Sequence, residues 1–224
     1  MKNFYINRRS FIVASSFSFL GYNAYARGEF ADKLTITPAS TEGPFHPDKL
    51  PLDTDNDLLI INDNITPAVG EITHLSGHVL TSAGTPISNA LVEIWQVDGQ
   101  GIYFHSKEPK LKKKDSNFQS YGRFSTNQKG EYYFRTVKPV PYGTRFFRTP
   151  HIHFKISHRS KHLLTTQMYI KGHKQNAKDF LYNKIKSERQ KENVTRDFKA
   201  IPNSKLNELT VNFDIILGYT PKDI

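Results

Sequence analysis

Two histidines in the second half of the chain stand two residues apart, within the sequence His151-Ile152-His153-Phe154. In a β-strand this alternation places both imidazoles on one face and the apolar pair on the other, with the histidine Cβ atoms about 7 Å apart. That separation allows two imidazoles to bind one metal ion. Such a pair also occurs on ordinary exposed strand faces, so the spacing alone leaves both interpretations open.

The lack of sulfur ligands narrows the chemistry of any metal site. The chain has no cysteine, which excludes disulfides, thiolate nucleophiles, cysteine-bound zinc and iron–sulfur clusters. A metal ion would therefore be bound by His, Asp or Glu or, if it is ferric, by the phenolate of Tyr.

The segments that would position these side chains alternate between short strands and turns. Alternating apolar and β-branched residues predict strands at 76–80, 90–95, 122–126, 131–137, 151–156, 165–170 and 209–217. The strands 122–126 and 131–137 flank a turn at 127–130 and predict a hairpin. The stretch 176–199 is polar and compatible with helix but has no strong apolar stripe. The pattern predicts an all-β domain with a short helical insertion near residues 176–199.

Length and composition limit the class of protein. The 224 residues suffice for one domain with a sizeable core. A hydrophobic share of 37%, a charged share of 23% and a mean hydropathy of −0.55 are typical of a soluble globular chain and argue against several membrane spans. The net charge of +10 would suit nucleic acid, a membrane surface or an acidic small molecule, and does not choose between them.

The first 26 residues have the pattern of a signal peptide. They carry three positive charges and no negative one, and an uncharged stretch from residue 10 ends in Ala24-Tyr25-Ala26. The pair Arg8-Arg9, followed by Ser-Phe-Ile, resembles a twin-arginine export signal. A Sec signal that happens to contain two arginines is one alternative. A membrane anchor is another, which is disfavoured because the apolar part is shorter than the roughly 18 to 20 residues that a span needs.

Export would leave a basic mature domain. Cleavage after Ala26 would remove three of the 31 Lys and Arg residues and none of the 21 acidic ones, which leaves a net charge of +7. The sequence thus predicts a signal peptide at 1–26, a domain at 27–224 and an exported protein, periplasmic or secreted, without stable membrane insertion after processing.

Two regions differ from the strand-rich part of the chain. Residues 33–70 contain five prolines and few periodic runs, which predicts a lead-in segment that wraps around the domain. Residues 107–114 contain five lysines and one glutamate. They are either a solvated loop or a basic lip over a pocket.

Several ordered motifs resemble the intradiol ring-cleavage dioxygenases, and specifically the protocatechuate 3,4-dioxygenase-like branch. In that family a strand ending in WQA precedes a Gly and a Tyr, and the motifs PGPY, RPAHIHF and TQLYF follow. This chain has, in the same order, WQVDGQGIY, PVPY, RTPHIHF and TTQMYI, together with EGPF near residue 42 and FDIIL near residue 213. The resemblance runs from about residue 40 to 218 and implies a single β-sandwich domain with long irregular loops.

The resemblance implies a non-haem Fe(III) ion as cofactor. Its ligands would be the residues that match the motifs: Tyr103, Tyr142, His151 and His153. The implied reaction cleaves a catechol-type aromatic between its two hydroxyl carbons with O₂ and gives a cis,cis-muconate-type product. In the family the second tyrosine leaves the metal when the substrate binds, so Tyr142 would also be catalytic.

Arg148 would stabilise negative charge on the substrate ring, as its counterpart does in the family, and would also bind the substrate. The other substrate contacts implied by the motifs are Gln167, Thr144 and Ile102. Without the resemblance, Arg148 would be interpreted as a surface ion-pair residue and Gln167 as an ordinary strand residue. Thr144 and Ile102 replace a tryptophan and an arginine of the protocatechuate enzymes, which affects the choice of substrate more than the metal.

Three further substitutions separate this chain from the family motifs: Val140 stands for Gly, Thr149 for Pro and Pro150 for Ala. The last two fall beside Arg148, so its backbone is expected to differ from that of the family.

The alternative function is a non-catalytic exported β-sandwich binding module that retains the dioxygenase fold. The presence of all four matched ligands favours the enzyme. Nucleic-acid binding is disfavoured because basic and aromatic residues do not alternate on a recognisable platform. The expected partners are a small aromatic diol and O₂, and a homo-oligomer is compatible with the family.

The remaining aromatic and histidine residues have structural interpretations. Trp95 and the run Tyr132-Tyr133-Phe134 are expected in the core. Seven histidines are expected on the surface or in local hydrogen bonds: His46, His74, His78, His105, His158, His162 and His173.

Overall fold

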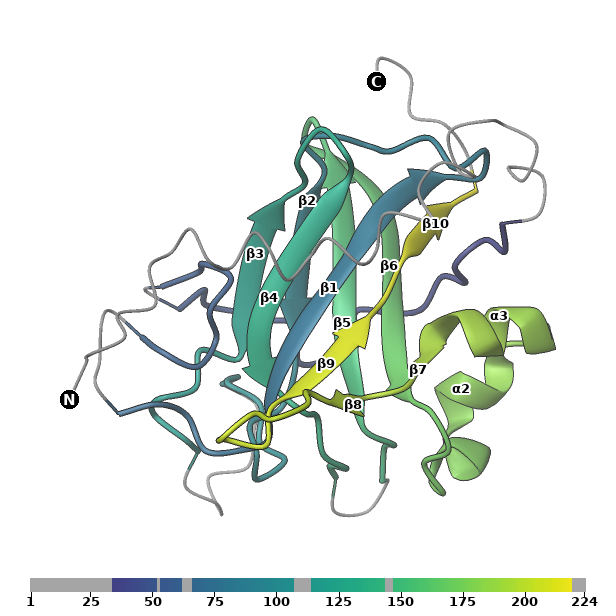
Figure 1. Cartoon of the computed structure of the whole chain (residues 1–224). Coiled ribbons are helices and arrows are strands. Elements are labelled where there is room, and N and C mark those ends of the chain that lie inside the picture. The colour runs from purple at the N-terminus through teal and green to yellow at the C-terminus, as the bar shows by residue number, and fades with distance from the viewer. Residues whose placement is uncertain (1–33, 52, 62–65, 107–113, 144–146, 219–224) are drawn as a thin grey trace.

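The protein folds into a two-layer β-sandwich (Figure 1). The structure, a computed structural model, describes residues 34–218 except 52, 62–65, 107–113 and 144–146. The strands within these residues are β1 (Ile72–Thr81), β2 (Leu91–Trp95), β3 (Tyr121–Ser125), β4 (Glu131–Val137), β5 (His151–His158), β6 (Lys161–Ile170), β7 (Thr195–Arg196), β8 (Lys199–Ala200), β9 (Leu209–Asn212) and β10 (Ile215–Leu217). The predicted β-sandwich class is confirmed, and the predicted signal at 1–26 lies outside the described residues.

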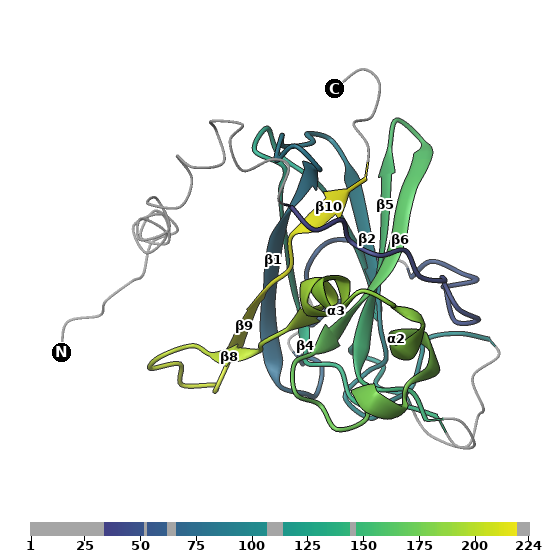
Figure 2. The same cartoon turned by 90° about the vertical axis from the view of Figure 1, so that its right-hand side faces the viewer.

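The two sheets have different strand orders. In the first sheet β1 pairs with β4 on one side and, in succession, with β9 and β10 on the other, while β8 pairs with β9. The second sheet has the order β3-β2-β5-β6-β7. Figure 2 shows both sheets from the side, with helices α2 (Phe180–Lys184) and α3 (Glu188–Val194) at the open edge between them.

The core lies between the facing sides of the sheets, as the period-two pattern requires. On β5, Ile152, Phe154 and Ile156 are fully buried, and the ring of Phe154 lies 4.9 Å from that of Phe213 and 6.2 Å from that of Tyr132. The expectation that Tyr133 also lies in the core is wrong. Alternation along β4 turns it to the outer face, where its hydroxyl bonds His74 Nδ1 at 2.5 Å.

The predicted strand at 209–217 is two strands, because side chains interrupt the ladder. Asp214 Oδ1 accepts the backbone N–H of His78 at 2.9 Å, in place of a main-chain partner. The carbonyl of Phe213 accepts the hydroxyl of Tyr132 and passes so close to Gly77 that a Cβ there would lie 2.0 Å from it. Glycine at position 77 therefore permits the break between β9 and β10.

The predicted hairpin of 122–126 and 131–137 is also wrong. β3 pairs with β2 and β4 pairs with β1, so the turn at 127–130 carries the chain from one sheet to the other. The N–H of Thr126 donates to the carbonyl of Ala90, the residue just before β2, whereas the carbonyl of Gly130 accepts the N–H of Val79 on β1. The two ends of the turn thus belong to different sheets, a long-range choice that the local sequence does not encode.

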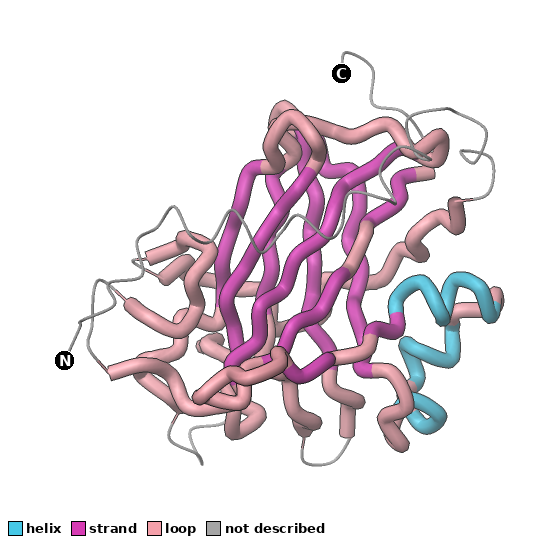
Figure 3. The backbone as a smooth tube through the Cα atoms, in the orientation of Figure 1, coloured by secondary structure: helices cyan, strands magenta, loops and turns pink. Residues whose placement is uncertain are grey.

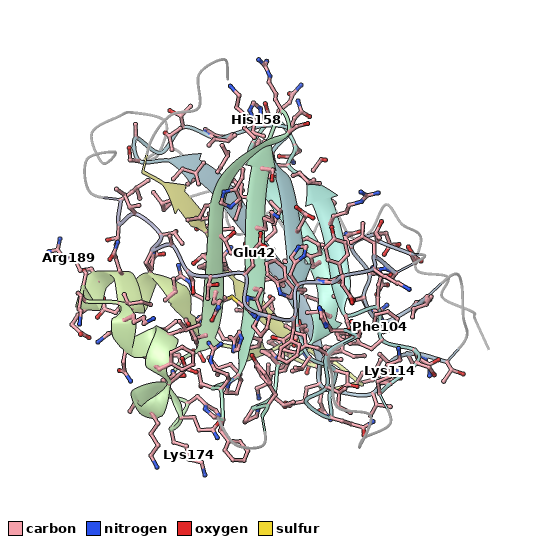
Figure 4. All side chains as sticks on the ribbon, turned by 180° about the vertical axis from the view of Figure 1, so that it is seen from behind. Glu42, Phe104, Lys114, His158, Lys174 and Arg189 are labelled. Carbon is pink, nitrogen blue, oxygen red and sulfur yellow. The ribbon has the colours of Figure 1, made fainter. Side chains whose placement is uncertain are left out.

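The lead-in segment packs against strands of both sheets, as expected of a segment that wraps around the domain. Thr37 exchanges hydrogen bonds with Ile216 of β10, and Ser40 donates its N–H to Thr165 of β6 at 2.8 Å. In Figure 4, Glu42 lies in front of the second sheet, where its carboxylate is 2.7 Å from Lys155 Nζ. The segment therefore covers the outer face of the second sheet.

The predicted helical insertion is confirmed as three short helices followed by strands β7 and β8. The 3₁₀ helix η4 (Asn176–Lys178) precedes α2 and α3. Among the described residues no helix is long and apolar enough to cross a membrane. Figure 3 shows the loops that gather at the end of the sandwich where β2 ends and β5 begins.

One ion pair that fixes β10 against β1 is expected to make stability depend on pH. The Asp214 carboxylate, 2.9 Å from His78 Nδ1, raises the pKa of His78 although burial opposes it, and Glu131 adds to the effect. The stabilisation is therefore complete below the unfolded pKa of about 6.5 and is lost as the pH rises through the higher folded value.

Chemical unfolding at about pH 5.5 and about pH 8.5 measures this dependence. The destabilisation caused by His78→Gln should be larger at the lower pH, and Asp214→Asn should remove the difference. Equal destabilisation at both pH values would contradict the assignment.

Candidate metal centre

The candidate site lies on the outer face of the second sheet. Strand pairing places Trp95 of β2, His153 of β5 and Gln167 of β6 side by side, and pairs His151 with Tyr169. Because side chains alternate along each strand, all five point away from the core formed by Ile152 and its neighbours. The strand alternation predicted from the sequence is what brings both histidines to one face.

The two imidazoles converge on one point. Nε2 of His151 lies 3.1 Å from Nε2 of His153. His151 Nδ1 bonds the carbonyl oxygen of Thr149 at 2.6 Å, which places the proton on Nδ1 and a lone pair on Nε2. Burial, with the nearby charge of Arg148, lowers the pKa of His151 to about 3, and burial also lowers that of His153. Both rings are therefore neutral, as metal ligands must be.

Both predicted tyrosine ligands lie beside the histidines. The Tyr103 ring centroid is 5.0 Å from that of Tyr142 and 6.2 Å from that of His153, and the Tyr142 centroid is 5.5 Å from that of His151. Burial raises the pKa of Tyr142, while the charge of Arg148 and a hydrogen bond with Tyr103 oppose that rise. The structure thus brings together all four residues that the motifs indicated.

A tight loop presents Tyr103, and a buried aspartate closes it. Asp98, which is 1% exposed, accepts the N–H groups of Gln100 and Ile102 on Oδ1 and that of Asp115 on Oδ2. Its own N–H donates to the carbonyl of Ile102. Sequence reasoning missed Asp98, although an Asp-Gly pair followed by a second glycine is a turn signal.

The loops of the two tyrosines pack against each other at Gly101. This glycine has φ of 81°, and a Cβ there would lie 3.0 Å from the Pro141 carbonyl oxygen and 3.6 Å from Tyr142 Cβ. Gly101→Ala is expected to cost about 1–2 kcal/mol from backbone strain and, by moving the Tyr142 loop, to weaken iron binding. Iron content and thermal unfolding check both effects.

Gly172→Ala is the matched control for this prediction. Gly172 has φ of 71° but nothing within 4 Å of its position for a Cβ. The control should lose similar stability and keep its iron affinity. Equal iron affinity in both variants would show that the contact between the loops has no effect on the site.

Arg148 is buried beside the site and held from two sides. Its Nε donates to Asp179 Oδ2 at 2.7 Å, and its Nη2 donates to Gln167 Oε1 at 2.8 Å. Backbone hydrogen bonds join Arg148 to Tyr142 in both directions. The guanidinium is thus fixed next to the Tyr142 ring. The interpretation of Arg148 as a surface ion-pair residue does not hold, since the side chain is 9% exposed and its partner Asp179 is fully buried.

The side chain of Gln167 is hydrogen bonded to other residues of the protein. Its Oε1 also accepts the Tyr169 hydroxyl at 3.0 Å, and its Nε2 donates to the carbonyl of Thr41 at 3.1 Å. The observed contacts therefore make Gln167 a support for Arg148, and direct substrate contact stays a prediction. Ile102 is buried next to Tyr103 at 3% exposure. Thr144 and most of the lysine-rich segment 107–114, predicted as a solvated loop or a basic lip, lie outside the described residues.

The lead-in segment covers the histidines and tyrosines. The Phe45 ring stacks on Tyr103 at a centroid distance of 5.0 Å, and a Cβ on Gly43 would lie 3.5 Å from His153 Cε1. Gly43 has φ of 73°, a conformation in which a side chain would be strained. The EGPF motif therefore contributes the cover of the site.

The prediction for the other histidines holds for His74, His78, His162 and His173, which make local hydrogen bonds. The His105 side chain is only 4% exposed and lies 3.9 Å from a carboxylate oxygen of Asp48. His158 is buried at the end of β5. His46 packs edge-on against Trp95 at 4.8 Å, and its Nε2 is buried without a hydrogen-bond partner. Trp95 is buried, but it lies on the outer face of the second sheet, away from the core between the sheets where it was predicted, and its ring stacks on His153 at 4.7 Å.

The four side chains fit a ferric ion. Two nitrogen ligands about 2.1 Å from one ion and at right angles are about 3 Å apart, close to the 3.1 Å between the histidine nitrogens. Within the described residues no three His, Asp or Glu side chains group as a metal site. The phenolates of Tyr103 and Tyr142, beside the histidines, would add the anionic oxygen donors that the hard Fe(III) ion prefers.

A separate cavity of about 440 Å³ lies behind Gln167 and Tyr169, between the lead-in segment and helices α2 and α3. None of the four predicted ligands is among the described residues that line it. Gln167 thus stands between the cavity and the site.

Comparison with known proteins gives consistent matches. The family model described as dioxygenase matches residues 41–218. The protocatechuate 3,4-dioxygenase β chain of Burkholderia cepacia is 32% identical over 154 residues, which is 66% of this chain and 65% of the relative. Catechol 1,2-dioxygenase 2 of Acinetobacter lwoffii is 31% identical over 153 residues, which is 61% of this chain and 52% of the relative. The aligned part thus spans about half to two thirds of the length of these relatives.

Solved structures share the fold. The dioxygenase domain of a dioxygenase carbohydrate-binding protein fusion from Streptomyces sp. SirexAA-E has a TM-score of 0.62 at 24% identity, over 83% of this chain and 100% of that one. The 3-chlorocatechol 1,2-dioxygenase of Rhodococcus opacus 1CP has a TM-score of 0.64 at 18% identity, over 96% of this chain and 90% of that one. Since the family model covers well over half of the sequence, the chain belongs to the intradiol dioxygenase family.

Proposed function

We propose that this protein is a non-haem Fe(III) dioxygenase that cleaves a catechol-type aromatic between its two hydroxyl carbons, with O₂ as co-substrate and a cis,cis-muconate-type product. One observation carries the proposal. The Nε2 atoms of His151 and His153 lie 3.1 Å apart, beside the rings of Tyr103 and Tyr142. Two phenolates and two neutral imidazoles suit ferric iron, because anionic oxygen donors neutralise a hard trivalent ion.

The residues around the centre have distinct roles in this proposal. Ferric iron bound there would supply the Lewis acidity that binds a catechol as its dianion and makes the ring reactive toward O₂. Burial raises the pKa of Tyr142, which makes its phenolate a stronger base. A Tyr142 displaced from the metal would therefore take up one of the catechol protons and become neutral. The guanidinium of Arg148 would stabilise negative charge on the ring. The segment around Phe45 would exclude water from the same space.

Metal loading and oxygen uptake test the proposal. The purified protein, loaded with iron, should show a visible tyrosinate-to-iron charge-transfer band and consume O₂ with catechol, protocatechuate or hydroxyquinol. Iron binding without that band would overturn the tyrosine ligands. A protein that binds no iron and consumes no O₂ would instead be a binding module that retains the fold.

We also propose that the enzyme is exported through the twin-arginine pathway. Residues 1–26 with Arg8-Arg9 support this proposal, and a route that passes folded proteins suits an enzyme that takes up its metal before export. Cell fractionation and N-terminal sequencing test it. The expected mature N-terminus is Arg27, the residue after Ala26, and the Arg8→Lys, Arg9→Lys double variant should accumulate uncleaved inside the cell. Export of that variant at the normal rate would contradict the pathway.

A further inference from the structure

We propose that Asp179 is a positioning residue for the site, which fixes the orientation and charge environment of Arg148. The proposal rests on the proposed function for its kinetic consequence, but not for its geometry. Asp179 lies 31 residues from Arg148 in the sequence, at the start of α2, and its side chain is fully buried. Its carboxylate is hydrogen bonded to Arg148, to Thr149 and to the first turn of α2, so it would act on the site through Arg148.

The two carboxylate oxygens of Asp179 accept hydrogen bonds from two different parts of the chain. Oδ1 accepts the N–H groups of Leu181 and Tyr182, both at 3.0 Å, and so caps α2. Oδ2 accepts Nε of Arg148 at 2.7 Å and the backbone N–H of Thr149 at 3.1 Å. One buried carboxylate therefore ties the helical insertion to the loop that leads into β5 and its histidines.

Thr149 explains why this carboxylate can hold the backbone as well as the side chain. The position is proline in the family motif, and proline has no N–H to donate. Threonine supplies that donor, and its hydroxyl bonds Asn176 Oδ1 at 2.6 Å, which gives a second tie to the insertion. The substitution that set this chain apart in the sequence is thus compensated by contacts with the segment 176–179.

The negative charge of Asp179 also stabilises the charged form of Arg148. Burial favours the neutral form of each side chain, yet their hydrogen bond raises the pKa of Arg148 and lowers that of Asp179. With Nε bound to Asp179 and one Nη group to Gln167, the guanidinium has a single orientation, and it is directed toward Tyr142. Removing the carboxylate would leave a buried cation without its counter-ion, which is strongly unfavourable.

The experiment compares Asp179→Asn with Ser187→Ala. Asparagine is an equally good helix cap but has no charge and cannot accept on both sides. Ser187 caps the neighbouring helix α3 by accepting the N–H of Gln190, and it makes no contact with Arg148. With the catechol that the wild type consumes, Asp179→Asn should lower kcat by about 10- to 100-fold with little change in KM. Ser187→Ala should leave kcat unchanged.

A second readout does not depend on activity. In nitrogen-15-edited NMR spectra of the wild-type protein, the Arg148 Nε–H, identified by its loss in Arg148→Lys, should exchange slowly with solvent. That protection should disappear in Asp179→Asn and persist in Ser187→Ala. Rapid exchange in the wild type, or an unchanged kcat in a folded Asp179→Asn variant, would overturn the proposal. Slow exchange in a wild type that consumes no O₂ would support the geometry and refute only the proposed function.

Discussion

Replacement of both tyrosines, in the double variant Tyr103→Phe and Tyr142→Phe, is expected to abolish the visible absorption band of the iron-loaded protein. The band would arise from charge transfer between phenolate and Fe(III), and phenylalanine has no oxygen to bind. Without two anionic donors the site would also lose affinity for Fe(III), and O₂ uptake should fall by at least about 100-fold. Absorption spectra, iron analysis and an oxygen electrode measure the three effects.

Tyr133→Phe is the control for this prediction. Tyr133 lies on the first sheet, where its hydroxyl bonds His74, so its loss should change stability slightly and leave the band and the O₂ uptake intact. The single variants Tyr103→Phe and Tyr142→Phe should show how much each tyrosine contributes to the band. The two positions differ in solvent access, since Tyr142 is half-buried and Tyr103 is 2% exposed. A wild-type spectrum in the double variant would refute both tyrosines as ligands.

Arg148→Lys is expected to lower kcat by about 10²- to 10³-fold, the usual effect of removing one group that stabilises charge in the transition state. Lysine keeps the positive charge, but it has no planar fork that could reach Asp179 and Gln167 together. The cation would therefore no longer be fixed next to Tyr142. Steady-state kinetics of the iron-loaded variant measure this effect, with iron content determined in parallel.

Arg135→Lys is the matched control. Arg135 pairs with Asp57 at 2.8 Å on the other sheet, so the same substitution there changes an ion pair at a distance from the site. Its kcat should equal that of the wild type. If Arg148→Lys keeps wild-type kcat with normal iron content, Arg148 does not act on the reacting ring.

The sequence predicted those parts of the site that depend on local periodicity. The alternation of His151 to Phe154 placed both histidines on one face because a strand has a period of two. Tyr103 and Tyr142 lie on loops, where no periodicity applies, and only the ordered motifs identified them. Asp179 is far from Arg148 in the chain, and its one local signal, an aspartate just before a short helix, indicates a cap and nothing of the arginine that it binds.

The errors in the predicted fold have a common physical cause. The break at Asp214 and the crossing between β3 and β4 both depend on partners far away in the sequence, namely His78 and the strands β1 and β2. Strand propensity correctly predicted the strands on both sides of the break and on both sides of the crossing. Which sheet a strand joins is decided by long-range packing that propensity does not contain.

The bond between Thr37 and Ile216 has a consequence for the order in which the protein is made. The segment that covers the candidate site follows Thr37 directly, and Thr37 is held by β10, the last strand that the structure describes. Because synthesis proceeds from the N-terminus, this segment leaves the ribosome early, but Thr37 gains its partner only when residues 215–217 have emerged. The four predicted ligands, between residues 103 and 153, thus leave the ribosome before the last described strand can hold the start of the segment that covers them.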